Sequence, residues 1–103
     1  MPGKRDGEGE VRTRTKSEVE KPPKYKVLIH NDDYTTMEFV VWILQDVFHH
    51  SPASATRVML HVHRMGVGVA GIYTRDIAET RVDQVLQLAR EAGHPLQCTM
   101  EPE

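Results

Sequence analysis

Hydrophobic side chains divide the chain into two parts at Pro22–Pro23. Residues 1–23 contain three apolar side chains besides proline, and charged side chains of both signs fill much of the rest. Such a segment buries too little apolar surface to offset the conformational entropy that it would lose on folding. We therefore predict a disordered, charged N-terminal tail over residues 1–23 and one folded core domain over residues 24–103.

The core domain shows the two hydrophobic periodicities that mark strands and helices. The clearest helical pattern lies between residues 37 and 48, where one face carries Met37, Val40, Val41, Leu44, Val47 and Phe48. We expect strands over residues 24–29, 67–73 and 96–100, and two more helices, one from Pro52 to near Gly66 and one that begins between Arg75 and Glu79 and ends at Gly93.

Capping signals mark the start of two of these helices. Thr35 and Glu38 fit a T-x-x-E capping box in front of the first helix. Ser51 and Pro52 supply a capping serine and a proline at the first position of the second helix. The resulting order is strand, helix, helix, strand, helix, strand. It predicts an α+β fold, a small two-layer domain with a three-stranded antiparallel sheet packed against three helices.

Charge and cysteine content narrow the class of protein. Residues 24–103 carry 7 Lys and Arg against 10 Asp and Glu, so the core domain is acidic and lacks the electrostatic footprint of a nucleic-acid-binding protein. No apolar run is long enough for a membrane span, and no secretory signal is present. The single cysteine, Cys98, excludes an internal disulfide. We expect a cytoplasmic protein that binds neither nucleic acid nor membranes.

The segment from Gly66 to Gly71 matches the dinucleotide-binding pattern G-x-G-x-x-G. A dinucleotide site places those glycines after a strand and at the start of a helix. Here they follow a predicted helix and lie in the next strand. We interpret them as glycines that allow close backbone packing, and we reject a nucleotide site.

The histidines and serines do not form a recognisable catalytic or metal-binding pattern. Neither the pair His49–His50 nor the pair His61 and His63 shares one helix face, and Cys98 has no cysteine near it in sequence. Capping explains Ser51, and neighbouring strand residues such as Asp32 and Asp33 point to opposite faces. We therefore expect no cofactor and no enzymatic activity, although histidines that are distant in sequence remain an alternative for a metal site.

Three acceptor-rich side chains, Asn31, Asp32 and Asp33, follow the first strand directly. They are open to two interpretations. One is turn chemistry, in which these side chains accept hydrogen bonds from nearby backbone groups. The other is that they receive a cation, because Thr35 is expected to cap the helix without them. The predicted helices would supply an apolar cup beside these acceptors, formed by Met37, Val40, Met59 and Val62.

Several short motifs, in order and at matching spacing from about Tyr25 to Glu101, resemble the ClpS family. These motifs are Tyr25-Lys26-Val27, Asn31-Asp32-Asp33-Tyr34-Thr35, Met37-Glu38-Phe39-Val40, Met59 with Val62-His63, Ala78-Glu79-Thr80, and His94-Pro95-Leu96 with Cys98. ClpS proteins are adaptors that deliver N-degron substrates to Clp-family AAA+ proteases.

The resemblance implies roles for ten residues of these motifs. Asn31, Asp32 and His63 would bind the α-amino group of the substrate, and Met37 would act as a gatekeeper that disfavours β-branched first residues. The pocket for a first side chain of Leu, Phe, Tyr or Trp would be lined by Asp33, Thr35, Met37, Val40, Met59, Val62 and Leu96. The family usually has proline where this chain has Thr36, which puts the strictness of the gatekeeper in doubt.

The resemblance also implies a partner. Asp76 and Arg81 match the surface through which the family contacts the N-terminal domain of a Clp-family AAA+ unfoldase, of the ClpA or ClpC type. In that family the unfoldase engages the N-terminal tail during handoff, and the charged tail expected here is a segment of the same kind, although its sequence matches no specific motif. Two other classes of function remain open: a small interaction domain that binds a partner helix or subunit through the same groove without selecting N-termini, and a metal-dependent enzyme.

Overall fold

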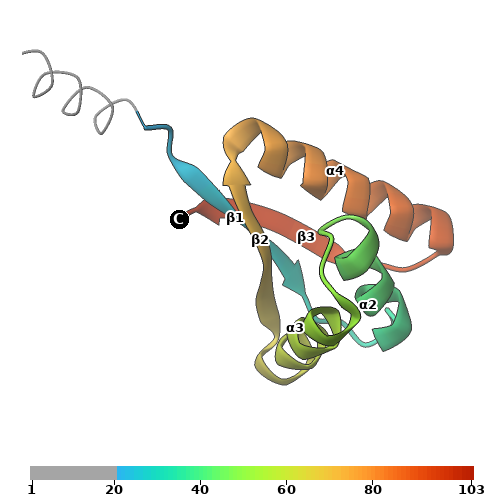
Figure 1. Ribbon diagram of the computed structural model, residues 1–103. Helices are drawn as coiled ribbons and strands as arrows, with labels where there is room; N and C mark the ends of the chain where they lie inside the picture. The colour runs from blue at the N-terminus through green and yellow to red at the C-terminus, as the bar shows by residue number, and fades with distance from the viewer. Residues whose placement is uncertain (1–20) are drawn as a thin grey trace, which may run out of the picture.

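The structure, a computed structural model, describes residues 21–103. Three strands and three helices follow one another in the predicted order (Figure 1). They are β1 (Lys24–His30), α2 (Met37–Asp46), α3 (Pro52–Met65), β2 (Val67–Thr74), α4 (Arg75–Ala92) and β3 (Gln97–Pro102). The tail expected over residues 1–23 lies almost wholly outside the described residues and stays a prediction.

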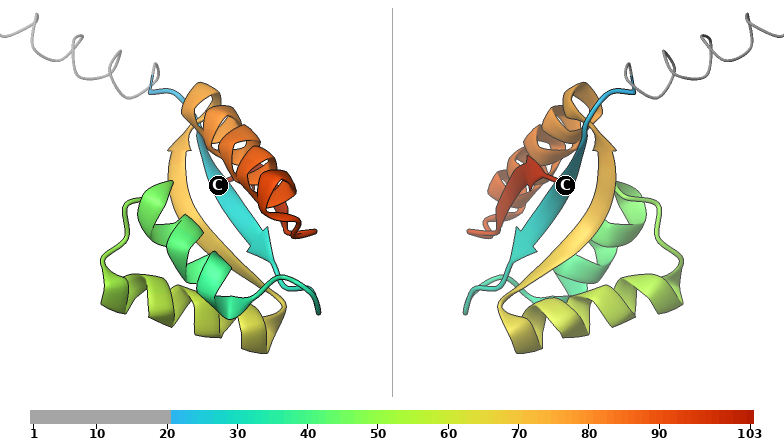
Figure 2. Two further views of the ribbon diagram at one scale, coloured as in Figure 1. Left: turned by 90° about the vertical axis from the view of Figure 1, so that its right-hand side faces the viewer. Right: turned by 90° about the vertical axis from the view of Figure 1, so that its left-hand side faces the viewer.

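The three strands form one antiparallel sheet in the order β2-β1-β3. Ile29 in the central strand pairs with Gly68 on one side and Cys98 on the other. Figure 2 shows the sheet from both sides: the helices cover one face, and the other face is open. The expected two-layer α+β fold is confirmed.

The core lies between the sheet and the helices. On β1 the side chains of Val27 and Ile29 are fully buried, whereas their neighbours on the other face are only partly covered. This alternation is what a strand with one packed face requires. The helices contribute the fully buried Ile43, Leu44 and Val85 to the same core.

The start of α2 differs from the capping box predicted from the sequence. Thr36, not Thr35, is the N-cap, and its hydroxyl oxygen accepts a hydrogen bond of 3.1 Å from the N–H of Phe39. Thr35 is engaged instead by Asp32, whose carboxylate accepts a hydrogen bond from the Thr35 hydroxyl. The prediction of a Thr35–Glu38 capping box was therefore wrong, because the neighbouring loop had already taken the Thr35 side chain.

The signals at the other helix ends were read correctly. Ser51 caps α3 through a hydrogen bond of 3.1 Å from the N–H of Ser54 to its side chain. Gly66 and Gly93 end α3 and α4 in the left-handed conformation, with φ of 90° and 78°. Glycine adopts this conformation without the steric cost that a Cβ brings.

Two glycines of the G-x-G-x-x-G segment allow the close packing that the sequence indicated. A Cβ on Gly68 would lie 2.7 Å from a methyl carbon of Val62, so its absence lets β2 approach α3. A Cβ on Gly71 would meet the ring of Tyr73. Both glycines lie in β2, away from any helix start, which agrees with rejecting a nucleotide site.

We expect Gly68→Ala to lower the free energy of unfolding by about 1–3 kcal/mol, because the added methyl group overpacks the contact between β2 and α3. Urea denaturation measures the change. In a Val62→Ala background, which removes the atom that the methyl group meets, the same substitution should cost clearly less. An equal cost in both backgrounds would show that this contact is not what requires glycine.

Candidate functional site

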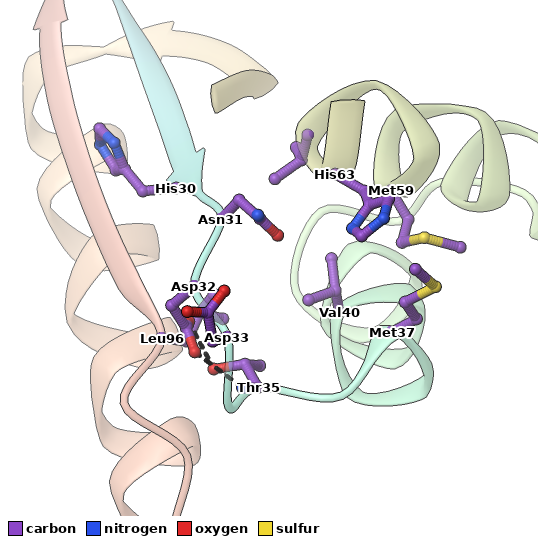
Figure 3. Close-up of a pocket in the computed structure, with 11 residues that line it drawn as sticks. His30, Asn31, Asp32, Asp33, Thr35, Met37, Val40, Met59, His63 and Leu96 are labelled. Carbon is purple, nitrogen blue, oxygen red and sulfur yellow. Dashed lines mark hydrogen bonds between the residues drawn. The ribbon is translucent and has the colours of Figure 1, made fainter. Parts of the chain in front are cut away.

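A cavity of about 240 Å³ opens at the end of β1, between the loop of residues 31–35 and helices α2 and α3 (Figure 3). This volume lies below the ~300–1,000 Å³ typical of sites for drug-sized ligands, and it suits a single side chain. The cavity is lined by His30, Asn31, Asp32, Asp33, Thr35, Met37, Val40, Met59, Val62, His63 and Leu96. The structure therefore brings together all ten residues expected to bind the amine or line the pocket.

The apolar part of the lining comes from three separate segments. Val40, Val62 and Leu96 are buried and belong to the core, so their positions are fixed by packing. Leu96 follows His94, whose ring packs against the ring of Phe39 with 4.6 Å between centroids and so holds this turn against α2. Met37, the first residue of α2, is 43% exposed, which leaves its flexible side chain at the cavity and accessible to solvent.

The carboxylate of Asp32 organises the loop. Its Oδ1 accepts hydrogen bonds from the backbone N–H groups of Tyr34 and Thr35, at 2.8 and 2.7 Å. Its Oδ2 accepts from the Thr35 hydroxyl at 2.7 Å (dashed in Figure 3). Partial burial by itself raises the pKa of Asp32. The hydrogen bonds from the Thr35 side chain and from the two N–H groups, together with the charge of His94, outweigh it and hold the pKa below its usual value. For Asp32 the turn interpretation is correct.

Three other polar side chains at the cavity do not form hydrogen bonds of this kind to the loop. Within residues 21–103, the side chains of Asn31, Asp33 and His63 make no hydrogen bond to protein, and all three residues are exposed. The backbone N–H of Asn31 donates to the carbonyl of Gly66 at 2.9 Å, which ties the loop to the end of α3. In Figure 3 the Asn31 side chain extends from the end of β1 toward α3, where His63 lies. The cavity thus carries acceptors whose hydrogen-bonding capacity is free.

One residue of the lining was missed by the sequence analysis. His30 ends β1 beside the cavity, but its Nε2 lies 2.8 Å from the Thr99 hydroxyl, and Figure 3 shows its ring turned toward β3. Its place next to Asn31 at the strand end was the only signal available. His30 therefore contributes to the shape of the cavity and leaves the polar contacts to its neighbours.

The two residues expected at the unfoldase interface lie elsewhere, on α4. Arg81 is half-buried and stacks over the ring of Tyr73 at 5.8 Å, and it donates a hydrogen bond of 3.2 Å to Gln84. Its Nε is buried and has no partner among residues 21–103. Asp76, in the first turn of α4, is exposed. Neither residue lines the cavity.

Other kinds of site were also sought in the described part of the chain. No three His, Cys, Asp or Glu side chains of residues 21–103 lie close enough together to hold a metal ion. None of the helices there has the length and apolar character needed to cross a membrane.

Comparison with known proteins agrees with the geometry. The family model described as "ATP-dependent Clp protease adaptor protein ClpS" matches residues 20–99. The chain is 56% identical over 95 residues to the ATP-dependent Clp protease adapter protein ClpS of Desulfatibacillum aliphaticivorans, covering 92% of this chain and 91% of that protein. It is 58% identical over 91 residues to the protein of the same name from Caulobacter vibrioides (strain NA1000 / CB15N), covering 88% and 84%.

A solved structure shows the same fold. Agrobacterium tumefaciens ClpS2 bound to L-phenylalaninamide superposes with a TM-score of 0.78 at 47% sequence identity, covering 81% of this chain and all of that one. The family model and the relatives therefore give the class of protein, an adaptor of a protease. The chain belongs to the ClpS family of ATP-dependent Clp protease adaptor proteins.

We expect the stabilising effect of the Asp32 carboxylate to depend on pH. Because folding lowers its pKa below the ordinary value of 3.8, the ionised group contributes stability above that pH and loses it as the pH falls through the folded value. The difference in unfolding free energy between the wild type and Asp32→Asn should be largest above the ordinary pKa of 3.8 and should shrink as the pH falls through the lowered folded pKa. Urea denaturation across this range measures it.

Asp33→Asn is the matched control, because no hydrogen bond within the described residues depends on its carboxylate. Its effect on stability should be small and should not follow the same pH profile. If Asp32→Asn is as neutral as Asp33→Asn at every pH, the loop does not depend on the Asp32 charge.

Proposed function

We propose that this chain binds the free α-amino group and the bulky hydrophobic first side chain (Leu, Phe, Tyr or Trp) of N-degron substrate proteins and delivers those proteins to a Clp ATPase. The observation that carries the proposal is a cavity of about 240 Å³ that has an apolar lining on one side and, on the other, three polar side chains without a partner among residues 21–103: Asn31, Asp33 and His63. The related ClpS2 structure supports it, since L-phenylalaninamide presents an aromatic side chain beside a free α-amine.

The amine is the part of such a ligand that selects for a chain terminus. An α-amino group has a pKa of about 8, so at neutral pH it is mostly charged and offers three N–H donors. The amide oxygen of Asn31, a carboxylate and a ring nitrogen of His63 would accept from them, and bonds to a charged donor are the stronger kind. His63 accepts only through a nitrogen that carries no proton.

Which carboxylate faces the amine is a point on which the geometry refines the expectation from the sequence. We expected Asp32 to bind the amine and Asp33 to line the pocket. Asp32 already accepts three hydrogen bonds from its own loop, whereas Asp33 accepts none within the described residues. A carboxylate has about four acceptor positions, so Asp33 keeps its full capacity and Asp32 keeps one. We propose Asp33 as the main carboxylate partner and Asp32 as the group that positions it.

The apolar lining then selects the first side chain. Burying a Leu or Phe side chain among Val40, Val62 and Leu96 is worth roughly 1.5–3 kcal/mol, or one to two decades of affinity. Met37 stands at the start of α2, where the Thr36 cap fixes the first helical turn. We propose that Met37 crowds β-branched first residues, and that the Thr36 cap replaces the restraint that proline gives other family members.

Delivery requires a second surface. We propose that Asp76 and Arg81 contact the N-terminal domain of a ClpA- or ClpC-type unfoldase. The unfoldase would hydrolyse ATP, and the protease associated with it would cleave the substrate. This chain would act as a non-enzymatic adaptor in the cytoplasm. Opposite charges on the first two turns of α4 suit a reversible polar interface.

A labelled Phe-initiated peptide should bind with a Kd in the micromolar range or below, and its N-acetylated twin should lose most of that affinity. Acetylation removes the charge and donors of the amine but leaves the aromatic side chain intact. Fluorescence anisotropy measures both. Each charge-assisted hydrogen bond lost costs about 1.5–3 kcal/mol, so we expect at least a tenfold difference.

Asp33→Asn should abolish most of the difference between the two peptides, whereas the wild type retains it. Equal binding of the two peptides by the wild type would instead support the alternative, a small interaction domain that binds a helix or subunit in the same groove without reading N-termini.

Arg81→Gln should weaken binding to the N-terminal domain of a ClpA-type unfoldase about fivefold or more, because it removes a charge from the proposed interface. Binding of the Phe-initiated peptide should be unchanged, since Arg81 lies outside the cavity. Calorimetry with the purified domain measures the first quantity. Arg90→Gln, at the exposed end of the same helix, is the control; equal effects of the two substitutions would argue against this interface.

A further inference from the structure

The outward face of α3 carries two arginines and a histidine and no acidic side chain. Residues 52–65 contain Arg57, His61 and Arg64 but neither Asp nor Glu, although the core domain as a whole is acidic. The three side chains are spaced by four and three positions, so they follow one face of the helix. These three side chains form a basic stripe on α3, although the domain as a whole is acidic.

The stripe borders a shallow hollow of about 410 Å³, lined by Arg57, Leu60, His61, Arg64 and Met65. Met65 is 67% exposed, and both arginines are exposed. Two other cations of the described residues meet carboxylates, Lys26 at 3.5 Å from Glu101 and Arg75 at 3.4 Å from Glu79. Neither Arg57 nor Arg64 takes part in an ion pair or a side-chain hydrogen bond within residues 21–103. Their guanidinium groups are open to a partner from outside the domain.

The basic stripe and the cavity lie on the two flanks of the same helix. Met59, Val62 and His63 line the cavity, and Arg64 follows His63 directly. A helix is about 10–12 Å across, so a chain leaving the cavity travels roughly 16–19 Å around α3 to reach its outer face. At about 3.3 Å per residue, this distance corresponds to five or six extended residues.

The opposite side of the cavity has the opposite charge. Asp32 and Asp33 lie in the loop there, and Glu38 lies in the first turn of α2. An acidic segment that emerges from the cavity would be repelled on this side and attracted toward α3. Guanidinium groups suit carboxylates because they donate two parallel hydrogen bonds.

We propose that the outer face of α3, through Arg57 and Arg64, binds acidic residues of the substrate chain a few positions after the N-terminal residue held in the cavity. The surface thereby adds a preference for Asp and Glu at about the sixth and seventh positions of the substrate. The inference rests on the proposed function, because it takes the bound N-terminus as the point from which the segment departs.

The test uses two Phe-initiated peptides that differ only at positions six and seven, Asp and Glu in one and Asn and Gln in the other. On the wild type at low salt, the acidic peptide should bind about three- to tenfold more tightly, which is the range for two exposed ion pairs. The advantage should disappear in the double variant Arg57→Gln/Arg64→Gln. It should also fall toward zero at about 1 M salt, where the Debye length is about 3 Å.

Arg90→Gln is the matched control, since Arg90 is an exposed arginine on α4 and should leave the advantage unchanged. Circular dichroism establishes that the variants are folded. An acidic peptide with no advantage on the wild type, or one that keeps its advantage in the double variant, overturns the inference.

The two proposals fail in different ways. If the neutral peptide binds with a free amine and not when acetylated, the proposed function stands whatever the charge dependence. If the acidic peptide binds equally well when acetylated and loses affinity in the double variant, α3 binds acidic segments independently of the cavity, and the link to the N-terminus is overturned.

Discussion

The shape of the cavity depends on a carboxylate that binds its own backbone. Asp32 accepts hydrogen bonds from Tyr34 and Thr35 and so closes the turn between β1 and α2. A second bond, from the N–H of Asn31 to the carbonyl of Gly66, attaches this turn to the end of α3. Because hydrogen bonds to Asp32 hold the loop, the side chains of Asn31 and Asp33 lie at the cavity and make none of the hydrogen bonds that hold it. The conformational entropy of these acceptors is therefore lost on folding, and a ligand that binds them would not have to order them.

The apolar side of the cavity is an extension of the core. Val40, Val62 and Leu96 pack with the interior and also line the cavity, so the volume available to a ligand follows from how closely the sheet and helices approach. Gly68 sets one of these approaches, where β2 meets Val62 without an intervening side chain. Residues that define such a cavity cannot relax independently of the fold, so the size of any group that can enter it has a fixed limit.

Much of this architecture could be predicted from local patterns. The faces of the helices, the Ser51 cap and the glycines at positions 66 and 93 follow from periodicity and backbone sterics, which act over a few residues. The cap of α2 could not be assigned in this way. The T-x-x-E pattern favours Thr35, and the capping by its neighbour Thr36 depends on Asp32 having taken Thr35. The strand order, with β1 in the centre, likewise depends on contacts between distant segments.

Seven of the eleven cavity residues were candidates from the sequence pattern, but Thr35, His63 and Leu96 were assigned to the site only through the resemblance to a family, since no local rule places Leu96 beside Asn31. The different hydrogen bonding of Asp32 and Asp33 could be predicted neither from local patterns nor from the resemblance. It appears only when the hydrogen bonds of each carboxylate are compared. Neighbouring identical side chains in a loop have different surroundings, and the surroundings decide which of them is left free to bind.

The buried Cys98 has a practical consequence. Burial between the sheet and the helices raises the pKa of this thiol to about 12, so almost none of it is thiolate near neutral pH. Since it is also the only cysteine of the chain, thiol-directed reagents find no ready nucleophile in the folded protein. A cysteine introduced at an exposed site would therefore take a fluorophore or spin label selectively, and the native residue could remain in place.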